Sequence, residues 1–100
     1  MVIYEVNLSV EPDIAQTYCA WLQKHIEEIL ALEGFLKATW YNIEPASEIA
    51  QKQYCIHYSL SDRDALERYF KEDAPRLRED GLKRFGGKFQ ASRRILTRGP

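Results

Sequence analysis

The chain has 100 residues, of which 45% are hydrophobic, so it can build one domain with one core and is too short for two. Its formal net charge of −1 argues against a protein whose main task is to coat nucleic acid or an anionic membrane. The charge is unevenly spread: residues 1–75 carry 6 basic and 13 acidic side chains, whereas residues 76–100 carry 8 basic and 2 acidic ones.

A strand and a long helix are predicted for the first third of the chain. Apolar and mostly polar side chains alternate with a period of two over residues 2–10, which indicates a strand with one buried face. Pro12 suits the first position of a helix, and Gly34 is placed to adopt the left-handed turn after its end. One half of this helix is apolar, and it carries Trp21 and His25 one turn apart.

Two further strands are predicted in the middle of the chain. Residues 35–44 mix aromatic and branched side chains, and their pattern leaves open which of them face the core. Pro45 is expected to end this strand, and the polar residues 46–52 to connect it to the next. Residues 53–60 alternate cleanly again and form the third predicted strand.

The last part of the chain is predicted to be an interrupted helix followed by a strand. The sequence Ser61-Asp62-Arg63-Asp64 resembles a capping box, with Asp64 in the third helical position. Pro75 is expected to break or restart the helix, and Gly86-Gly87 to end it. Residues 88–97 then form the fourth strand.

The order β-α-β-β-α-β predicts a single ferredoxin-like α+β domain over residues 1–100. In this fold a four-stranded antiparallel sheet, in the order 4-1-3-2, carries both helices on one face. The helices cannot cover the other face, which is expected to carry apolar side chains such as Ile3 and Cys55. Two such faces packed together form a dimeric α/β barrel, so we expect a homodimer.

Several classes of function lack support in the sequence. No apolar run approaches the roughly 18–20 residues that span a bilayer, and no signal-peptide pattern occurs, so we expect a cytoplasmic protein without membrane contact. Cys19 and Cys55 have no CxxC partner and His25 and His57 belong to different elements, so neither a metal site nor a disulfide is expected. Residues 84–89 resemble an RNA-recognition motif but precede the last strand, so nucleic-acid binding is not expected.

Separate blocks of the sequence carry a resemblance to a known family. These blocks are Tyr4-Glu5-Val6-Asn7-Leu8-Ser9-Val10, Trp21-Leu22, His25-Ile26, Gly34-Phe35, Ala74-Pro75-Arg76-Leu77-Arg78, Gly81-Leu82, Arg84-Phe85-Gly86 and Arg93-Arg94-Ile95-Leu96. The pattern resembles a family of small bacterial proteins known only as a domain of unknown function. That family is distantly similar to the dimeric α/β-barrel proteins of the antibiotic-biosynthesis-monooxygenase type. The resemblance implies the fold and a dimer, and neither a defined reaction nor a cofactor.

His25 is the candidate catalytic residue. With an ordinary pKa it acts as a general base near neutral pH, or donates a hydrogen bond to a bound carbonyl or phenolate. The alternative is a histidine packed in the helix and satisfied by a main-chain carbonyl. Trp21 beside it is either a ligand platform or a core residue.

A second set of candidates belongs to the uncovered face of the sheet. It combines a carboxylate, an amide, a hydroxyl, an imidazole and a guanidinium, from Glu5, Asn7, Ser9, His57 and Arg93. Inside a barrel these groups bind a polar organic ligand, or they form an interface network in which Glu5 pairs with Arg93 or with an arginine of the second subunit. Three aromatic side chains line a cavity for a planar substrate or fill the barrel: Trp40, Tyr41 and Tyr54.

Two functional hypotheses follow from these patterns. In the first, a homodimer binds a small polar or anionic molecule, and a cofactor-independent monooxygenase or isomerase is its catalytic variant. His25, Trp21, His57 and Arg93 would then line the pocket, and the basic end of the chain would attract the anion. In the second, the chain is a non-catalytic structural or protein-interaction module. A cavity of several hundred Å³ at His25 or His57 favours the first, and a filled interior favours the second.

Overall fold

The computed structural model describes residues 1–44 and 51–100. In chain order the elements are β1 (Val2–Val10), the 3₁₀ turn η1 (Pro12–Ile14), α1 (Ala15–Leu30), β2 (Phe35–Ile43), β3 (Lys52–Leu60), α2 (Arg63–Glu72), α3 (Ala74–Phe85), the 3₁₀ turn η2 (Gly86–Lys88) and β4 (Phe89–Thr97). This order confirms the predicted ferredoxin-like α+β fold. Pro45 and most of the predicted connection over residues 46–52 lie outside the described residues.

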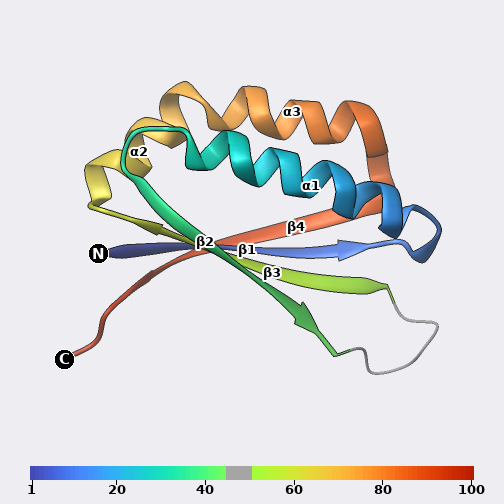
Figure 1. Ribbon diagram of the computed structural model, residues 1–100, viewed down its shortest axis with the longest axis horizontal. Helices are drawn as coiled ribbons and strands as arrows, with labels where there is room; N and C mark the ends of the chain where they lie inside the picture. Colours follow the sequence, from blue (N-terminus) through green and yellow to red (C-terminus); the bar gives the residue numbers. More distant parts are fainter. Residues whose placement is uncertain (45–50) are drawn as a thin grey trace.

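The four strands form one antiparallel sheet in the order β2-β3-β1-β4, as predicted. β1 lies in the interior of the sheet, so Glu5 faces His57 of β3 on one side and Arg94 of β4 on the other. The helices lie together on one face of the sheet, and none of the described elements covers the opposite face (Figure 1). The fold therefore has a covered face and an open face.

The start of the first helical region differs from the prediction. Pro12 begins a 3₁₀ turn rather than an α-helix, and α1 itself begins at Ala15. The side chain of Glu11 makes no capping hydrogen bond, and 3₁₀ geometry is common where an uncapped first turn tightens. At the other end, Gly34 has the expected positive φ, of 92°, although α1 already ends at Leu30 with Ala31 as its right-handed C-cap.

The interruption of the second helical region is confirmed. α2 ends at Glu72, and Pro75 occupies the first turn of α3, where its missing N–H is not needed. The capping prediction is wrong by one residue, because Asp62 rather than Ser61 accepts a 2.8 Å hydrogen bond from the Ala65 N–H. The backbone N–H of Ser61 instead donates to the Gly34 carbonyl, which ties the end of β3 to the turn before β2.

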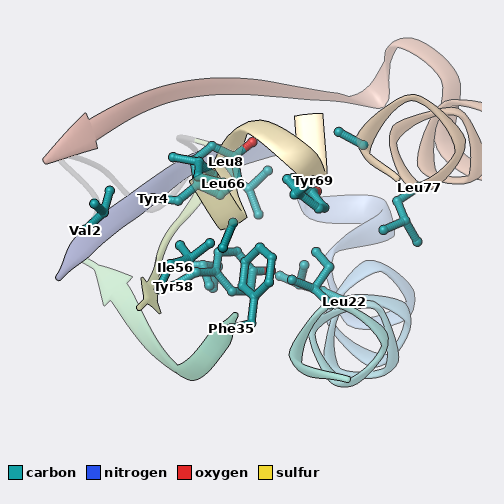
Figure 2. Close-up of a cluster of buried hydrophobic side chains, with 14 of the residues drawn as sticks. Val2, Tyr4, Leu8, Leu22, Phe35, Ile56, Tyr58, Leu66, Tyr69 and Leu77 are labelled. Carbon is teal, nitrogen blue, oxygen red and sulfur yellow. The ribbon is translucent and has the colours of Figure 1, made fainter. Parts of the chain in front are cut away.

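The core lies between the covered face of the sheet and the three helices. Figure 2 shows side chains from the sheet and from the helices meeting in one cluster. Tyr4 from β1 contacts Tyr58, Tyr69 and Phe70, with ring centroids 6.0, 5.8 and 5.3 Å away. Leu66 of α2 is completely buried in the same cluster. Within residues 1–44 and 51–100, no helix is long and apolar enough to cross a membrane.

The structure settles the orientation of β2, which the sequence pattern left open. A register shift between Phe35 and Lys37 marks a bulge at the start of the strand. Beyond it Trp40 contacts Tyr54 on the covered face, whereas Tyr41 contacts His57 on the open face. Phe35 is buried and the two residues after it are both exposed, so the bulge breaks the simple alternation that sequence analysis depends on.

Gly34 offers a direct test of how closely the sheet and α2 approach. A Cβ at Gly34 would lie 2.4 Å from the Cβ of Ala65, and the positive φ adds backbone strain. We expect Gly34→Ala to lower the free energy of unfolding by about 3 kcal/mol in urea titrations. Gly87→Ala is the matched control, because a Cβ there meets nothing within 4 Å. An equal loss in both variants would contradict this account of the Gly34 contact.

Candidate functional site

A small cavity lies between the sheet and the helices. Its volume is about 50 Å³. Its polar and aromatic lining is formed by Tyr4, Tyr18, Trp21, His25, Tyr58, Tyr69, Arg78, Phe89 and Arg93. This volume holds a few water molecules or one small polar group, whereas whole ligands occupy pockets of several hundred Å³. The cavity thus contains His25, but its volume is below the several hundred Å³ that was expected for the first functional hypothesis.

Trp21 and His25 are held together at this cavity. Their rings stack with centroids 4.6 Å apart, and the Trp21 Nε1–H donates a 2.9 Å hydrogen bond to Asp80 Oδ2 of α3. Gly81 allows this approach, because a Cβ there would lie 3.0 Å from the Trp21 ring. Arg84 also donates to Asp80, at 3.2 Å. Asp80 therefore positions the indole, and the indole positions the imidazole.

Burial lowers the pKa of His25 from 6.5 to about 4. The guanidinium of Arg93 lowers the pKa further, and the carboxylate of Asp80 opposes both effects. His25 is therefore neutral at pH 7, and the interpretation of a histidine with an ordinary pKa is wrong. A neutral imidazole with so low a pKa is a weak base, but it both donates and accepts hydrogen bonds.

Two arginines line the same cavity. Arg78 donates a 3.1 Å hydrogen bond to the Tyr4 hydroxyl, and its guanidinium lies 5.8 Å from the Phe70 ring centre. Burial raises the pKa of Tyr18 and of Tyr58, and the charge of Arg93 opposes this rise, as it also lowers the pKa of His25. Within the described ranges, neither arginine forms a salt bridge with a carboxylate. The cavity thus carries two guanidiniums, while the nearby carboxylate of Asp80 is bonded to Trp21 and Arg84.

The predicted place of Arg93 on the uncovered face is wrong. The structure pairs Val6 with Arg93 and Glu5 with Arg94, so Arg93 points to the covered face and Arg94 to the open face. Successive side chains of a strand alternate between faces, so an error of one position exchanges the two arginines. Ala91 and Ile95 share the face of Arg93. This alternating apolar pattern indicates that Arg93, and not Arg94, is on the covered face.

The open face carries a second polar cluster, centred on the buried Glu5. His57 Nε2 lies 2.8 Å from Glu5 Oε1, and the Cys55 thiol lies 3.6 Å from the same oxygen. The amide of Asn7 donates to Glu5 Oε2 at 3.0 Å, and the Arg94 guanidinium donates to Oε2 as well. The structure thus brings together Glu5, Asn7 and His57, which the sequence analysis placed in one group. It adds Cys55 and Arg94, which that group did not contain.

Glu5 is ionised although only 4% of it is exposed. Hydrogen bonds from Arg94 and then from Asn7 lower its pKa from 4.5 to about 2, against the opposing effect of burial. The pKa of the Cys55 thiol is raised, first by burial and then by the charge of Glu5. The cluster therefore has a fixed carboxylate beside a protonated thiol.

This cluster also provides a set of metal-ligating atoms. The donor atoms of Glu5, Cys55 and His57 all lie within 4.8 Å of one another. Sequence reasoning missed this set because Glu5 and Cys55 are 50 positions apart and meet only through the pairing of β1 with β3. The available signal was the Cys-x-His spacing at 55–57, which places both side chains on one face of a strand.

The remaining aromatic candidates lie away from His25. Trp40 and Tyr54 are paired edge to face, with ring centroids 5.5 Å apart, and line an open hollow with Cys19. Tyr41 lies against His57 on the open face. His25 and His57 are thus on opposite sides of the sheet and cannot line one pocket within a subunit. Cys19 and Cys55 are both free thiols.

A comparison with protein-family models finds one match. The model described as "Domain of unknown function (DUF4286)" matches residues 1–98. A comparison with curated proteins finds no match.

Solved structures share the fold at low sequence identity. A variant of SnoaB, a cofactor-independent oxygenase from Streptomyces nogalater, is 14% identical with a TM-score of 0.73, over 97% of this chain and 91% of that one. A structure named antibiotic biosynthesis monooxygenase is 12% identical, with a TM-score of 0.70 and full coverage of both chains. A protein of the ethyl tert-butyl ether d (EthD) family from Bacillus halodurans is 19% identical, with a TM-score of 0.69, over 99% of this chain and 100% of that one. At these identities the likeness shows the fold alone.

The depressed pKa of His25 predicts a pH dependence of stability. The unfolded chain takes up a proton on His25 as the pH falls through 6.5, whereas the folded chain does so only near pH 4. Acidification across this range therefore favours the unfolded state. We expect the wild-type protein to lose about 2 kcal/mol more of its free energy of unfolding than His25→Gln between pH 6.5 and 4.

Urea titrations at stepped pH values measure this difference. Gln23→Ala, at an exposed position of the same helix, is the control, because it removes no titratable group, and it should keep the wild-type decline. If the free energy of unfolding of His25→Gln fell as steeply with pH as that of the wild type, the low pKa of His25 would be refuted.

Proposed function

Starting from the fact that this chain belongs to the DUF4286 family, we propose that it binds a small organic anion, whose charged group enters the cavity beside His25. The observation that carries the proposal is the pair of arginines, Arg78 and Arg93, at one cavity without a carboxylate partner among the described residues. An anion that enters meets both guanidiniums without first breaking an ion pair. Arginine also suits carboxylate and phosphate groups, because its planar fork donates two parallel hydrogen bonds.

The size of the cavity limits which part of the ligand is enclosed. A volume of about 50 Å³ accommodates one charged or polar group and not a whole metabolite. Arg93 lines the cavity and is exposed to solvent, so the rest of the ligand would extend outward past its guanidinium. The stacked Trp21 and His25 rings favour a planar group at the entrance.

The neutral His25 contributes a hydrogen bond in this proposal rather than a proton transfer. Its pKa of about 4 leaves it a weak base at neutral pH, so the structure gives less support to a monooxygenase or isomerase reaction than to binding. A bound anion would raise the pKa of His25 by placing a negative charge beside it. Binding is therefore expected to strengthen as the pH falls toward 5.

We also propose that the binding protein is a homodimer closed at its open face. Tyr41 and Ile43 on β2 expose 49% and 40% of their surface, and they lie on the same open face as the buried charge of Glu5. A second copy would shield these apolar groups and surround the Glu5 cluster. A structural module without a ligand would keep this dimer and lack anion binding.

Tryptophan fluorescence offers a test of the anion site. In a Trp40→Phe background the remaining indole is Trp21, which lines the cavity. A panel of aromatic carboxylates, each paired with its neutral amide, should contain carboxylates that quench this emission while their amides do not. Arg93→Gln should weaken the binding of those carboxylates at least tenfold, which corresponds to about 1.4 kcal/mol.

Arg94→Gln is the matched control, because Arg94 is the neighbouring arginine on the opposite face. It should bind the same carboxylates as tightly as the Trp40→Phe parent. Equal losses in the two variants would point to a general charge effect and would contradict an anion site at Arg93.

Sedimentation velocity tests the dimer. We expect the wild-type protein to sediment as a dimer at micromolar concentration, and Tyr41→Lys to raise the dissociation constant more than tenfold by placing a charge in the interface. Leu82→Lys is the control, because Leu82 is a 58% exposed apolar residue on α3, on the helix side of the sheet. A monomeric wild-type protein would refute the proposal.

A further inference from the structure

The cluster at Glu5 lies outside the anion cavity, on the opposite face of the sheet. Its three donor atoms come from two paired strands: Glu5 from β1, and Cys55 and His57 from β3. These atoms all lie within 4.8 Å of one another. Carboxylate oxygen, thiolate sulfur and imidazole nitrogen are the donors that zinc sites combine.

The two oxygens of Glu5 have separate partners. Oε1 lies 2.8 Å from His57 Nε2 and 3.6 Å from Cys55 Sγ, so both other donor atoms lie beside this oxygen. Oε2 accepts hydrogen bonds from Asn7 and Arg94, which fix the orientation of the carboxylate. This division resembles the arrangement in metal sites, where a ligating carboxylate is itself held by hydrogen bonds from outside.

The position on a sheet also keeps the three ligands close together. Glu5 and His57 are direct cross-strand neighbours, and Cys55 lies two residues along β3 on the same face. Glu5 and Cys55 are 4% and 9% exposed, and the His57 side chain is 25% exposed. Two ligands are thus fixed by their surroundings, and in the single chain, before a second copy covers this face, the third is accessible to an ion in solution.

We propose that Glu5 Oε1, Cys55 Sγ and His57 Nε2 bind one divalent cation of the Zn²⁺ class. The sulfur and nitrogen donors select Zn²⁺ or Co²⁺ over Mg²⁺ or Ca²⁺, which prefer oxygen ligands alone. On binding, the S–H bond of Cys55 breaks, its proton passes to the solvent, and the sulfur keeps the electron pair for the metal. Three protein ligands leave the fourth tetrahedral position open to water or to another molecule.

Arg94 does not occupy the place of the metal. It donates to Oε2, whereas the ion would bind at Oε1, and 69% of its side chain is exposed. In the single chain, solvent therefore screens much of its charge from the ion. The site does not depend on the anion cavity, whose residues lie on the covered face.

Co²⁺ and Zn²⁺ titrations of the chain without an affinity tag test this site. We expect one Co²⁺ per chain and the near-ultraviolet absorption that reports a thiolate bound to Co²⁺, with Zn²⁺ displacing the Co²⁺. Cys55→Ser should abolish that absorption, and His57→Gln should keep it while weakening affinity at least tenfold. Cys19→Ser is the matched control, because it removes the other free thiol, and it should bind as the wild type does.

Asn7→Ala separates the metal ligands from the residue that positions them. It should keep the thiolate absorption and lower affinity about tenfold, because the amide orients the carboxylate without touching the ion. Circular dichroism checks that each variant is folded, and the Cys55 and His57 variants are independent tests should one of them unfold. The proposal is overturned if the wild type gives no thiolate absorption, if the absorption disappears in Cys19→Ser, or if Mg²⁺ competes as well as Zn²⁺.

Discussion

The alternation of side chains along β1 is the constraint on which both sites depend. β1 lies between β3 and β4, so each of its residues has neighbours on both sides and faces either the helices or the open face. Tyr4 enters the aromatic core and accepts the hydrogen bond of Arg78, whereas the next residue, Glu5, organises the cluster on the opposite face. A shift of one residue in this strand would exchange the core and the polar cluster, so its register is strongly specified.

On the covered face, one contact between helices sets the geometry of the cavity. The hydrogen bond from Trp21 to Asp80 joins α1 to α3, and Gly81 removes the side chain that would keep the two helices apart. The indole then covers one side of His25, which contributes to the burial that lowers the pKa of the imidazole. Packing and electrostatics are therefore coupled here, because loosening this contact would hydrate His25 and raise its pKa.

Sequence patterns predicted the order of the elements and of the strands, because both depend on local periodicity and on a small set of allowed topologies. Sequence patterns failed where the placement of a side chain depends on a strand register exact to one residue, or on packing between distant parts of the chain. Arg93 and Arg94 are adjacent and chemically identical, so only the strand register decides which of them meets Glu5. The pKa of His25 depends on burial by residues distant in sequence. The contact of Glu5 with Cys55 likewise exists only once β1 and β3 are paired.

The ion pairs show which basic residues at the end of the chain carry its excess positive charge. Most of its cations meet a carboxylate, in the pairs Arg76–Asp73, Lys83–Glu79, Arg84–Asp80, Lys88–Asp13 and Arg94–Glu5. Among the residues the structure describes, Arg78, Arg93 and Arg98 have no such partner, and the first two line one cavity. The positive excess is therefore concentrated at the cavity rather than spread over a surface. A nucleic-acid or membrane surface would require the spread arrangement, whereas a small anion requires only this local one.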